Sequence, residues 1–166
     1  MEHKRFFDIF LGVIALLLLL FPCIIISFLV LITSKGPILH WSKRKGINNI
    51  DFMMPKFRSM IFEAPIASSE GINQKKYLTP IGNFIRKYSL DEFPQLLSIL
   101  KGDMSFVGPR PALFNQEDLI FLRSQHGVDK LLPGITGWAQ VNGRDELSIP
   151  KKVELDKEYL EHQSFL

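Results

Sequence analysis

Two adjacent carboxylates stand at the start of a predicted helix in the segment SLDEFPQLLSILKGDMSFVGPRP, residues 89–111. A local explanation is a capping box, in which Ser89 is the N-cap and Glu92 occupies the third helical position. Asp91 and Glu92 would then only complement the positive end of the helix dipole. A chemical explanation is that the helix N-terminus lowers the pKa of both carboxylates and attracts a phosphoryl group. The segment alone favours the local explanation, because acidic first turns are common.

Arginines supply further groups that could bind phosphate. Arg110 lies between two prolines in GPRP, and a guanidinium held by φ-restricted neighbours is a good bidentate phosphate ligand, although a structural salt bridge explains it equally well. Arg58, Arg86 and Arg144 are additional substrate-binding candidates, each of which is more typical of a structural role when taken singly. A hard cation such as Mg2+ suits one or two carboxylates together with substrate phosphate oxygens.

Other common catalytic signatures are missing from the sequence. One cysteine and four scattered histidines cannot form a Cys/His metal cluster, and the histidines are predicted to lie at the surface. No Walker A loop, G-x-G-x-x-G or G-x-S-x-G motif occurs. Gly134, Gly137 and Gly143 permit close approach to a flat ligand, but turn formation accounts for each of them as well. The net charge of +3 is compatible with an anionic partner without identifying one.

An uncharged stretch at residues 9–32 is long enough to cross a bilayer core of about 30 Å. It is longer than the apolar region of a secretory signal and no small-residue cleavage site closes it, so we expect it to be retained. Pro22 near its middle is predicted to divide it into residues 9–21 and 23–32 with a kink between them. Basic residues flank both ends, so the positive-inside bias favours neither orientation. A re-entrant helix and a kinked spanning helix both remain open from these residues.

The rest of the chain predicts one soluble unit, residues 35–166, after a membrane-inserted segment, residues 1–34. A β-hairpin is predicted where ILHWS and DFMMPKFRSM flank the turn-rich KRKGINN, with Pro55 indicating an edge strand. Residues 63–76 lack periodicity and are predicted to form a mobile loop. Residues 131–146 indicate loop and strand. Helices are predicted at about 80–87, 90–100 and 112–123, and from Ser148 to about His162 with Pro150 at the first position. The predicted class is therefore α+β, helix-rich, with one small hairpin.

Three segments together resemble the bacterial sugar transferase family: KFRSM at 56–60, TPIGNFIRKYSLDEFPQLLSILKGDMSFVGPRP at 79–111, and PGITGWAQVNGR at 133–144. These monotopic phosphoglycosyl transferases transfer a sugar 1-phosphate from a UDP-sugar to undecaprenyl phosphate. The resemblance covers nearly the whole chain from Lys4, and the three motifs in this order are highly specific. With one N-terminal hydrophobic segment, the chain looks like a minimal catalytic unit of the short type.

The resemblance implies roles for individual residues. It makes Asp91 the nucleophile, Glu92 the Mg2+ ligand and Arg110 a phosphate ligand. It makes Pro22 the kink of a re-entrant membrane helix, and residues 4–8 match the KR-x-x-D pattern that precedes it. The acidic pair is then expected to be a catalytic dyad, which is compatible with a capping role in the absence of substrate.

Two departures from the family pattern are visible. Phe21 stands where the family often has serine before the kink proline, so a hydroxyl that could satisfy the broken helix backbone is absent. The chain ends at YLEHQSFL, whereas relatives usually continue through another amphipathic stretch, so a truncated C-terminus is left open.

The sequence thus predicts an enzyme of the bacterial inner (cytoplasmic) membrane with its catalytic domain on the cytoplasmic side. It would initiate a surface glycan, such as capsule, O-antigen or exopolysaccharide, and release UMP. Its expected partners are a UDP-sugar, undecaprenyl phosphate and membrane lipid, with no nucleic acid; a homodimer and downstream glycosyltransferases are left open as further partners. The alternative is a catalytically inactive, membrane-anchored protein that binds a nucleotide-sugar or a lipid phosphate.

Overall fold

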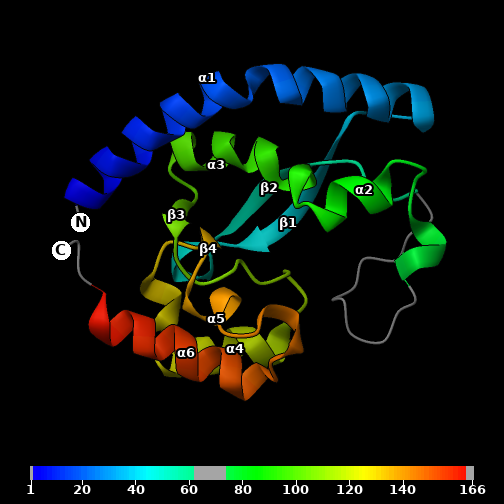
Figure 1. Cartoon of the computed structure of the whole chain (residues 1–166). Helices are drawn as coiled ribbons and strands as arrows, with labels where there is room; N and C mark the ends of the chain where they lie inside the picture. The colour runs from blue at the N-terminus through cyan, green and yellow to red at the C-terminus, as the bar shows by residue number, and fades with distance from the viewer. Residues whose placement is uncertain (1, 62–73, 164–166) are drawn as a thin grey trace.

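The longest element is the N-terminal helix α1, Glu2–Thr33, which arches over the rest of the molecule in a computed structural model that describes residues 2–61 and 74–163 (Figure 1). Its buried positions include Asp8, Gly12, Ile26 and Val30, whose spacing places them on one face of the helix. The remaining circumference exposes large apolar side chains, including Phe6, Phe10, Leu17, Leu18, Phe21 and Phe28. By length and composition, residues 3–33 could cross a membrane, and they are the single such helix among the described residues.

Pro22 lies inside α1 rather than between two helices. The apolar stretch therefore forms one continuous helix, and Figure 1 shows that α1 bends along its length. A proline removes one backbone hydrogen bond without ending a helix when neighbouring groups hold the next turn. Just after the proline, the Ser27 hydroxyl donates a hydrogen bond of 2.7 Å to the carbonyl oxygen of Cys23.

The predicted hairpin is present. Strands β1 (Leu39–Lys45) and β2 (Asp51–Phe57) pair antiparallel, and the turn between them contains a short 3-10 helix, η1 (Ile47–Asn49). Asn48 and Asn49 adopt positive φ angles of 53° and 58°, a conformation that asparagine tolerates better than most residues. Pro55 is paired with Trp41 in this two-stranded sheet, where each strand has an open edge and proline is tolerated.

The helix predicted over residues 90–100 is present in two parts. The 3-10 helix η3 (Leu90–Gln95) contains Pro94 and leads into the α-helix α3 (Leu96–Lys101). Ser89 has a left-handed backbone with φ 55° and makes no capping hydrogen bond through its side chain. The predicted capping box is therefore wrong, because this backbone geometry differs from the extended geometry of a typical N-cap.

The helix predicted from residue 112 begins later, at Glu117. The preceding residues are bound to the hairpin instead, since Leu113 forms an isolated bridge with Arg44 and Lys45 N donates 3.0 Å to Ala112 O. The predicted C-terminal helix is confirmed with Ser148 at its N-cap, but Ile149 is its first residue, so Pro150 occupies the second position and not the predicted first. The remaining helices are α2 (Gly82–Lys87), α4 (Glu117–Gln125), α5 (Trp138–Val141) and α6 (Ile149–His162), and the short 3-10 helices are η2 (Gln74–Tyr77), η4 (Val128–Lys130) and η5 (Arg144–Glu146).

A second small sheet was not predicted. Strands β3 (Ser105–Val107) and β4 (Gly134–Thr136) pair in parallel, so the single predicted hairpin was an incomplete account. Glycines let the two strands meet, because a Cβ on Gly134 would lie 2.1 Å from the backbone nitrogen of Gly108. Of the predicted loop at residues 63–76, residues 74–76 belong to η2 and residues 63–73 lie outside the described part of the chain.

Three clusters of buried apolar side chains form the core. They connect the elements that lie next to one another in Figure 1. The first joins α1 to the hairpin and α2 through Ile26, Val30, Phe57 and Ile85. The second packs the hairpin against α3, and the third packs α4 against α6, as in the contact of Leu119 with Val153. Helix α1 therefore contributes side chains to the same core that supports the hairpin and η3.

Candidate active site

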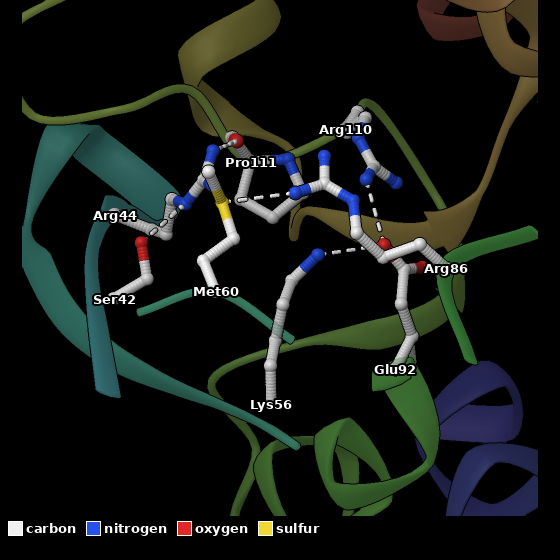
Figure 2. Close-up of polar contacts among 8 residues, drawn as sticks. All are labelled: Ser42, Arg44, Lys56, Met60, Arg86, Glu92, Arg110 and Pro111. Carbon is white, nitrogen blue, oxygen red and sulfur yellow. Dashed lines mark hydrogen bonds and ion pairs between the residues drawn. The ribbon is translucent and has the colours of Figure 1, made fainter. Parts of the chain in front are cut away.

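The two acidic residues of η3 lie at the junction of this helix with β2. Asp91 and Glu92 are both buried, with 7% and 8% of their surfaces exposed. Oε1 of Glu92 accepts 2.7 Å hydrogen bonds from Lys56 Nζ and from Arg110 Nη2 (Figure 2). One carboxylate oxygen thus binds two cations that are contributed by segments distant in the sequence.

The local structure explains why these side chains meet. Lys56 is in β2, its side chain is 17% exposed, and its amine reaches Glu92. Arg110 is in the loop after β3, and both neighbouring prolines are buried.

Two more arginines lie in this region. Figure 2 shows the side chains of Lys56, Arg86 and Arg110 on the side of Glu92, and that of Arg44 farther away, next to Ser42 and Pro111. Nη1 of Arg86 lies 3.0 Å from the sulfur of Met60, and Nη1 of Arg44 donates 3.2 Å to the carbonyl of Pro111. Four basic side chains near two acidic ones give an excess of positive charge, which suits a ligand with more than one phosphate.

The pKa of Glu92 is lowered to about 2. Burial alone would raise this pKa, but the charges of Lys56 and Arg110 and their hydrogen bonds to the carboxylate outweigh the burial. Glu92 is therefore held ionised by its two cationic partners.

The pKa of Asp91 is shifted in the opposite direction. Burial is the largest cause and raises the pKa, while the charges of Lys56 and Arg86 oppose the rise and that of Glu92 adds to it. The prediction that the helix terminus lowers both pKa values is thus wrong for Asp91, because desolvation dominates there. A carboxylate anion that is poorly stabilised by its surroundings is a better base and nucleophile. Neighbouring carboxylates whose pKa values shift in opposite directions typically have different roles in a reaction.

The surrounding cations also respond to burial. Burial lowers the pKa of Lys56, and Glu92 counteracts the effect. The pKa of Arg44 falls to about 10, chiefly through burial and then through repulsion from Arg110. Repulsion between these guanidinium groups would be relieved by an anion bound between them.

Two of the four predicted arginines are not part of this cluster. Arg58 is buried. Its Nη2 donates 2.9 Å hydrogen bonds to the carbonyl oxygen and to the hydroxyl of Ser34, so it stabilises the position of the end of α1. Arg144 is exposed at φ 51° in η5, and no contact among the described residues joins it to the acidic pair. The structure brings Arg86 and Arg110 to the site and leaves Arg58 and Arg144 out of it.

Sequence reasoning missed Lys56 and Arg44. Lys56 begins the KFRSM segment and lies in the predicted strand, but its contact with Glu92 appears only in the folded chain. Arg44 lies on the partner strand and faces the site only because of the hairpin register, which a sequence does not reveal. The predicted histidines are exposed, as expected.

The glycines of residues 133–144 have roles in the backbone structure. A Cβ on Gly137 would lie 2.1 Å from Gly108 O, so this residue and Gly134 allow two chain segments to touch each other. Gly143 has a φ of 140° and forms a turn. Turn formation therefore explains Gly143, whereas Gly134 and Gly137 permit the close approach of another backbone segment.

Basic and acidic residues of the KR-x-x-D pattern fix the beginning of α1. Lys4 Nζ donates 2.8 Å to Val107 O, and Arg5 donates to the carbonyls of Ile99 and Leu100 at the end of α3. Buried Asp8 accepts 3.1 Å hydrogen bonds from the Ser105 hydroxyl and from Phe106 N. With Ser34 bound to Arg58, both ends of α1 are attached to the same domain.

The donor set of the acidic pair fits only part of a metal site. No group of three or more His, Cys, Asp or Glu residues that could hold a metal ion occurs within residues 2–61 and 74–163. Two neighbouring carboxylates supply the oxygen donors that Mg2+ prefers, although one oxygen of Glu92 already binds two cations. These residues suit a cation whose remaining ligands come from substrate phosphates and water.

Known proteins resemble the chain along nearly its whole length. It is 40% identical to the "Uncharacterized sugar transferase EpsL" of Bacillus subtilis, with 98% of this chain and 79% of that protein covered. It is 37% identical to the "UDP-glucose:undecaprenyl-phosphate glucose-1-phosphate transferase" of Escherichia coli, covering 97% of this chain and 36% of that protein. The "Exopolysaccharide production protein ExoY" of Sinorhizobium fredii is 34% identical, with 98% of this chain and 79% of that protein covered. The family described as "Bacterial sugar transferase" matches residues 1–166. The chain belongs to the bacterial sugar transferase family.

Proposed function

We propose that the protein transfers a sugar 1-phosphate from a UDP-sugar to undecaprenyl phosphate, releasing UMP and initiating the synthesis of a surface glycan. The observation that carries this proposal is the pair of buried carboxylates, of which Glu92 accepts hydrogen bonds from Lys56 and Arg110. Relatives that are named as UDP-glucose:undecaprenyl-phosphate or undecaprenyl-phosphate sugar transferases support the choice of substrates.

In this proposal the basic side chains bind the diphosphate of the donor. Attack of an anion on a phosphate is opposed by repulsion, so positive groups must offset the charge before a nucleophile can approach. In the proposal, Arg110 and Arg86 bind phosphate oxygens, and Lys56, which donates a hydrogen bond to Glu92 as Arg110 does, keeps this carboxylate oriented. Arg58 and Arg144, which lie outside the cluster, are left out of the proposed binding set.

Asp91 is the proposed nucleophile. A carboxylate oxygen of Asp91 attacks the β-phosphorus, the bond from this phosphorus to the bridging oxygen breaks, and UMP leaves with the electron pair. An acyl phosphate carrying the sugar remains on Asp91. An oxygen of undecaprenyl phosphate then attacks the same phosphorus, which forms the lipid diphosphate sugar and regenerates the carboxylate.

Mg2+ is the proposed metal, held by Glu92 together with phosphate oxygens of the donor. When bound, it would offset the negative charge of the diphosphate. Turnover is then expected to disappear on chelation and to return with added Mg2+. Turnover that is unchanged in chelator would remove the metal from the proposal.

The proposed membrane placement is re-entrant. Residues 1–34 form the membrane-inserted part, residues 35–166 form the catalytic part, and both ends of α1 face the cytoplasm at the inner membrane. Support comes from the contacts of Asp8 and Ser34, at opposite ends of α1, with one domain. A domain on one side of a bilayer can hold both ends only if the helix enters and leaves by the same face. Basic residues on both flanks of the apolar stretch favour the cytoplasmic side.

The test is the mass of the intact protein after incubation with UDP-sugar and Mg2+ and without lipid acceptor. We expect a sugar-phosphate adduct on Asp91 and ping-pong kinetics. Asp91→Asn removes the nucleophile and is expected to abolish both the adduct and turnover, while the folded state is retained because the amide has nearly the same shape. Glu92→Gln is expected to slow adduct formation and weaken the Mg2+ dependence.

A matched control is a second pair of neighbouring acidic residues, Glu117 and Asp118, in the first turn of α4. Both side chains are exposed. Asp118→Asn is expected to leave the adduct and the rate unchanged. An active preparation that gains no mass on rapid quenching, and whose kinetics require both substrates bound together, would replace the covalent step with direct transfer. Absence of UMP release with every UDP-sugar would leave the alternative of a binding protein.

A further inference from the structure

Arg123 of α4 and Asp156 of α6 form a buried ion pair. Both residues are far in sequence from Asp91 and Glu92. Arg123 donates to Oδ2 of Asp156 twice, from Nε at 3.0 Å and from Nη2 at 2.7 Å. Asp156 is 1% exposed and Arg123 is 9% exposed. Two hydrogen bonds from one guanidinium fix its plane as well as its position.

The third bonded nitrogen of this guanidinium points toward the site. Nη1 of Arg123 donates a 2.8 Å hydrogen bond to the backbone carbonyl of Arg110. Arg110 is the residue whose own side chain binds Glu92. A single planar group therefore connects a buried aspartate on α6 to the backbone of an arginine in the candidate active site.

The loop that carries Arg110 is held through its carbonyls. Pro109 O accepts from Gly134 N at 2.9 Å, Pro111 O accepts from Arg44, and Ala112 O accepts from Lys45 N at 3.0 Å. With Arg110 O bound to Arg123, four successive carbonyls have partners. The two prolines have no N–H to donate, so the loop depends on these acceptors for its position.

We propose that Arg123 and Asp156 are positioning residues for Arg110: Asp156 orients the Arg123 guanidinium, which holds the Arg110 carbonyl so that the Arg110 side chain reaches the donor phosphate. The proposal rests on the proposed function, in which Arg110 binds phosphate. Neither residue of the pair touches substrate. The geometry is specific to arginine, because the amine of a lysine cannot bind Asp156 at two points and reach the carbonyl as well.

A purely structural role predicts different behaviour. The α4 and α6 helices also pack through Leu119 and Val153, so loss of the ion pair would then lower stability and the fraction of active enzyme. The KM for the donor does not depend on the active fraction. Displacement of Arg110 would instead raise this KM or lower kcat in the folded enzyme.

The experiment is a double-mutant cycle on initial rates, with UDP-sugar varied at saturating lipid acceptor. Arg123→Lys is expected to lower kcat/KM for the donor about tenfold, since small displacements of a binding group have large effects on rate. Asp156→Asn keeps an acceptor oxygen and is expected to have a smaller effect in the same direction. In an Arg110→Lys background, Arg123→Lys is expected to cost less than about twofold, because the group it positions is already altered.

Controls separate the outcomes. Glu161→Gln removes an exposed ion pair with Lys157 on the same helix and is expected to leave the kinetics unchanged. Equal losses from Arg123→Lys in both backgrounds, or a loss confined to the active fraction with an unaltered KM, would overturn the positioning role. Near-normal turnover of Arg110→Lys alone would refute the phosphate-binding role of Arg110 on which the proposal rests.

Discussion

At the scale of the residue, the site depends on two neighbouring carboxylates in different surroundings. Glu92 binds two cations through one oxygen, whereas Asp91 is buried and its pKa is raised chiefly by desolvation. The first arrangement stabilises an anion and the second makes an anion reactive. Chain neighbours can differ in this way because successive side chains of η3 point in different directions.

Lys56 can be tested separately from the reaction. Lys56→Met retains the apolar stem and removes the charge, which leaves buried Glu92 with one cationic partner fewer. We expect a loss of about 2 kcal/mol in the free energy of unfolding, because a buried charge that loses a partner is destabilised. Chemical denaturation in detergent micelles measures this loss in the free energy of unfolding.

The matched control is Lys101→Met. Lys101 forms a 2.9 Å ion pair with Asp103, but its side chain is 74% exposed. Exposed ion pairs contribute about 0 to 1 kcal/mol to the free energy of unfolding, so we expect Lys101→Met to change it little. Equal effects of the two substitutions would mean that the Lys56 contact does not stabilise the fold.

At the scale of the element, sequence predicted what depends on local pattern. Residues 82–87 and 149–162 are helical within the predicted ranges, and the hairpin was identified from its turn residues. Contacts between distant segments were not predictable. The three-residue strands β3 and β4 exist because Gly108 and Gly134 let two backbones approach, and the later start of α4 reflects the binding of residues 112–113 to the hairpin.

The candidate site shows the same division. The resemblance to a family identified Asp91, Glu92 and Arg110, whereas Lys56 and Arg44 required the register of a folded hairpin. The rise in the pKa of Asp91 also required structure, because desolvation depends on what packs around a side chain.

The contact between α1 and α3 depends on a glycine. A Cβ on Gly12 would lie 2.9 Å from Cδ2 of Leu100, the far end of a flexible side chain. Gly12→Ala is therefore expected to be tolerated, because Leu100 can move. Gly12→Leu is expected to separate the helices and cost about 1–3 kcal/mol in the free energy of unfolding. Thermal unfolding in micelles compares the two variants, and equal midpoints would show that α1 and α3 do not pack closely at this point.

At the scale of the whole molecule, the placement of α1 decides the topology. The helix has 32 residues and is about 48 Å long, enough to span a bilayer if it were upright. Its contacts at both ends lie on one domain, which favours the re-entrant arrangement.

Topology is measured with single cysteines at His3 and Lys35 in a Cys23→Ser background. We expect both to react with a thiol reagent presented from the cytoplasmic side and neither to react from the outer side. Pro22→Ala restores a backbone donor, straightens the helix and is expected to shift part of the population to a spanning form. Reaction of one position only from the outer side in the Pro22 protein would contradict the re-entrant model.

The sharing of a core between α1 and the hairpin has a consequence for biogenesis. Ile26 and Val30 pack with Phe57 and Ile85, while the opposite side of α1 is apolar and exposed. During synthesis α1 leaves the ribosome before Phe57 and Ile85, so it is expected to enter the lipid before these residues can pack against it. The bilayer then acts as a template that presents one helical face to the emerging domain, and a water-soluble version made by deleting the helix would lack part of its own interior.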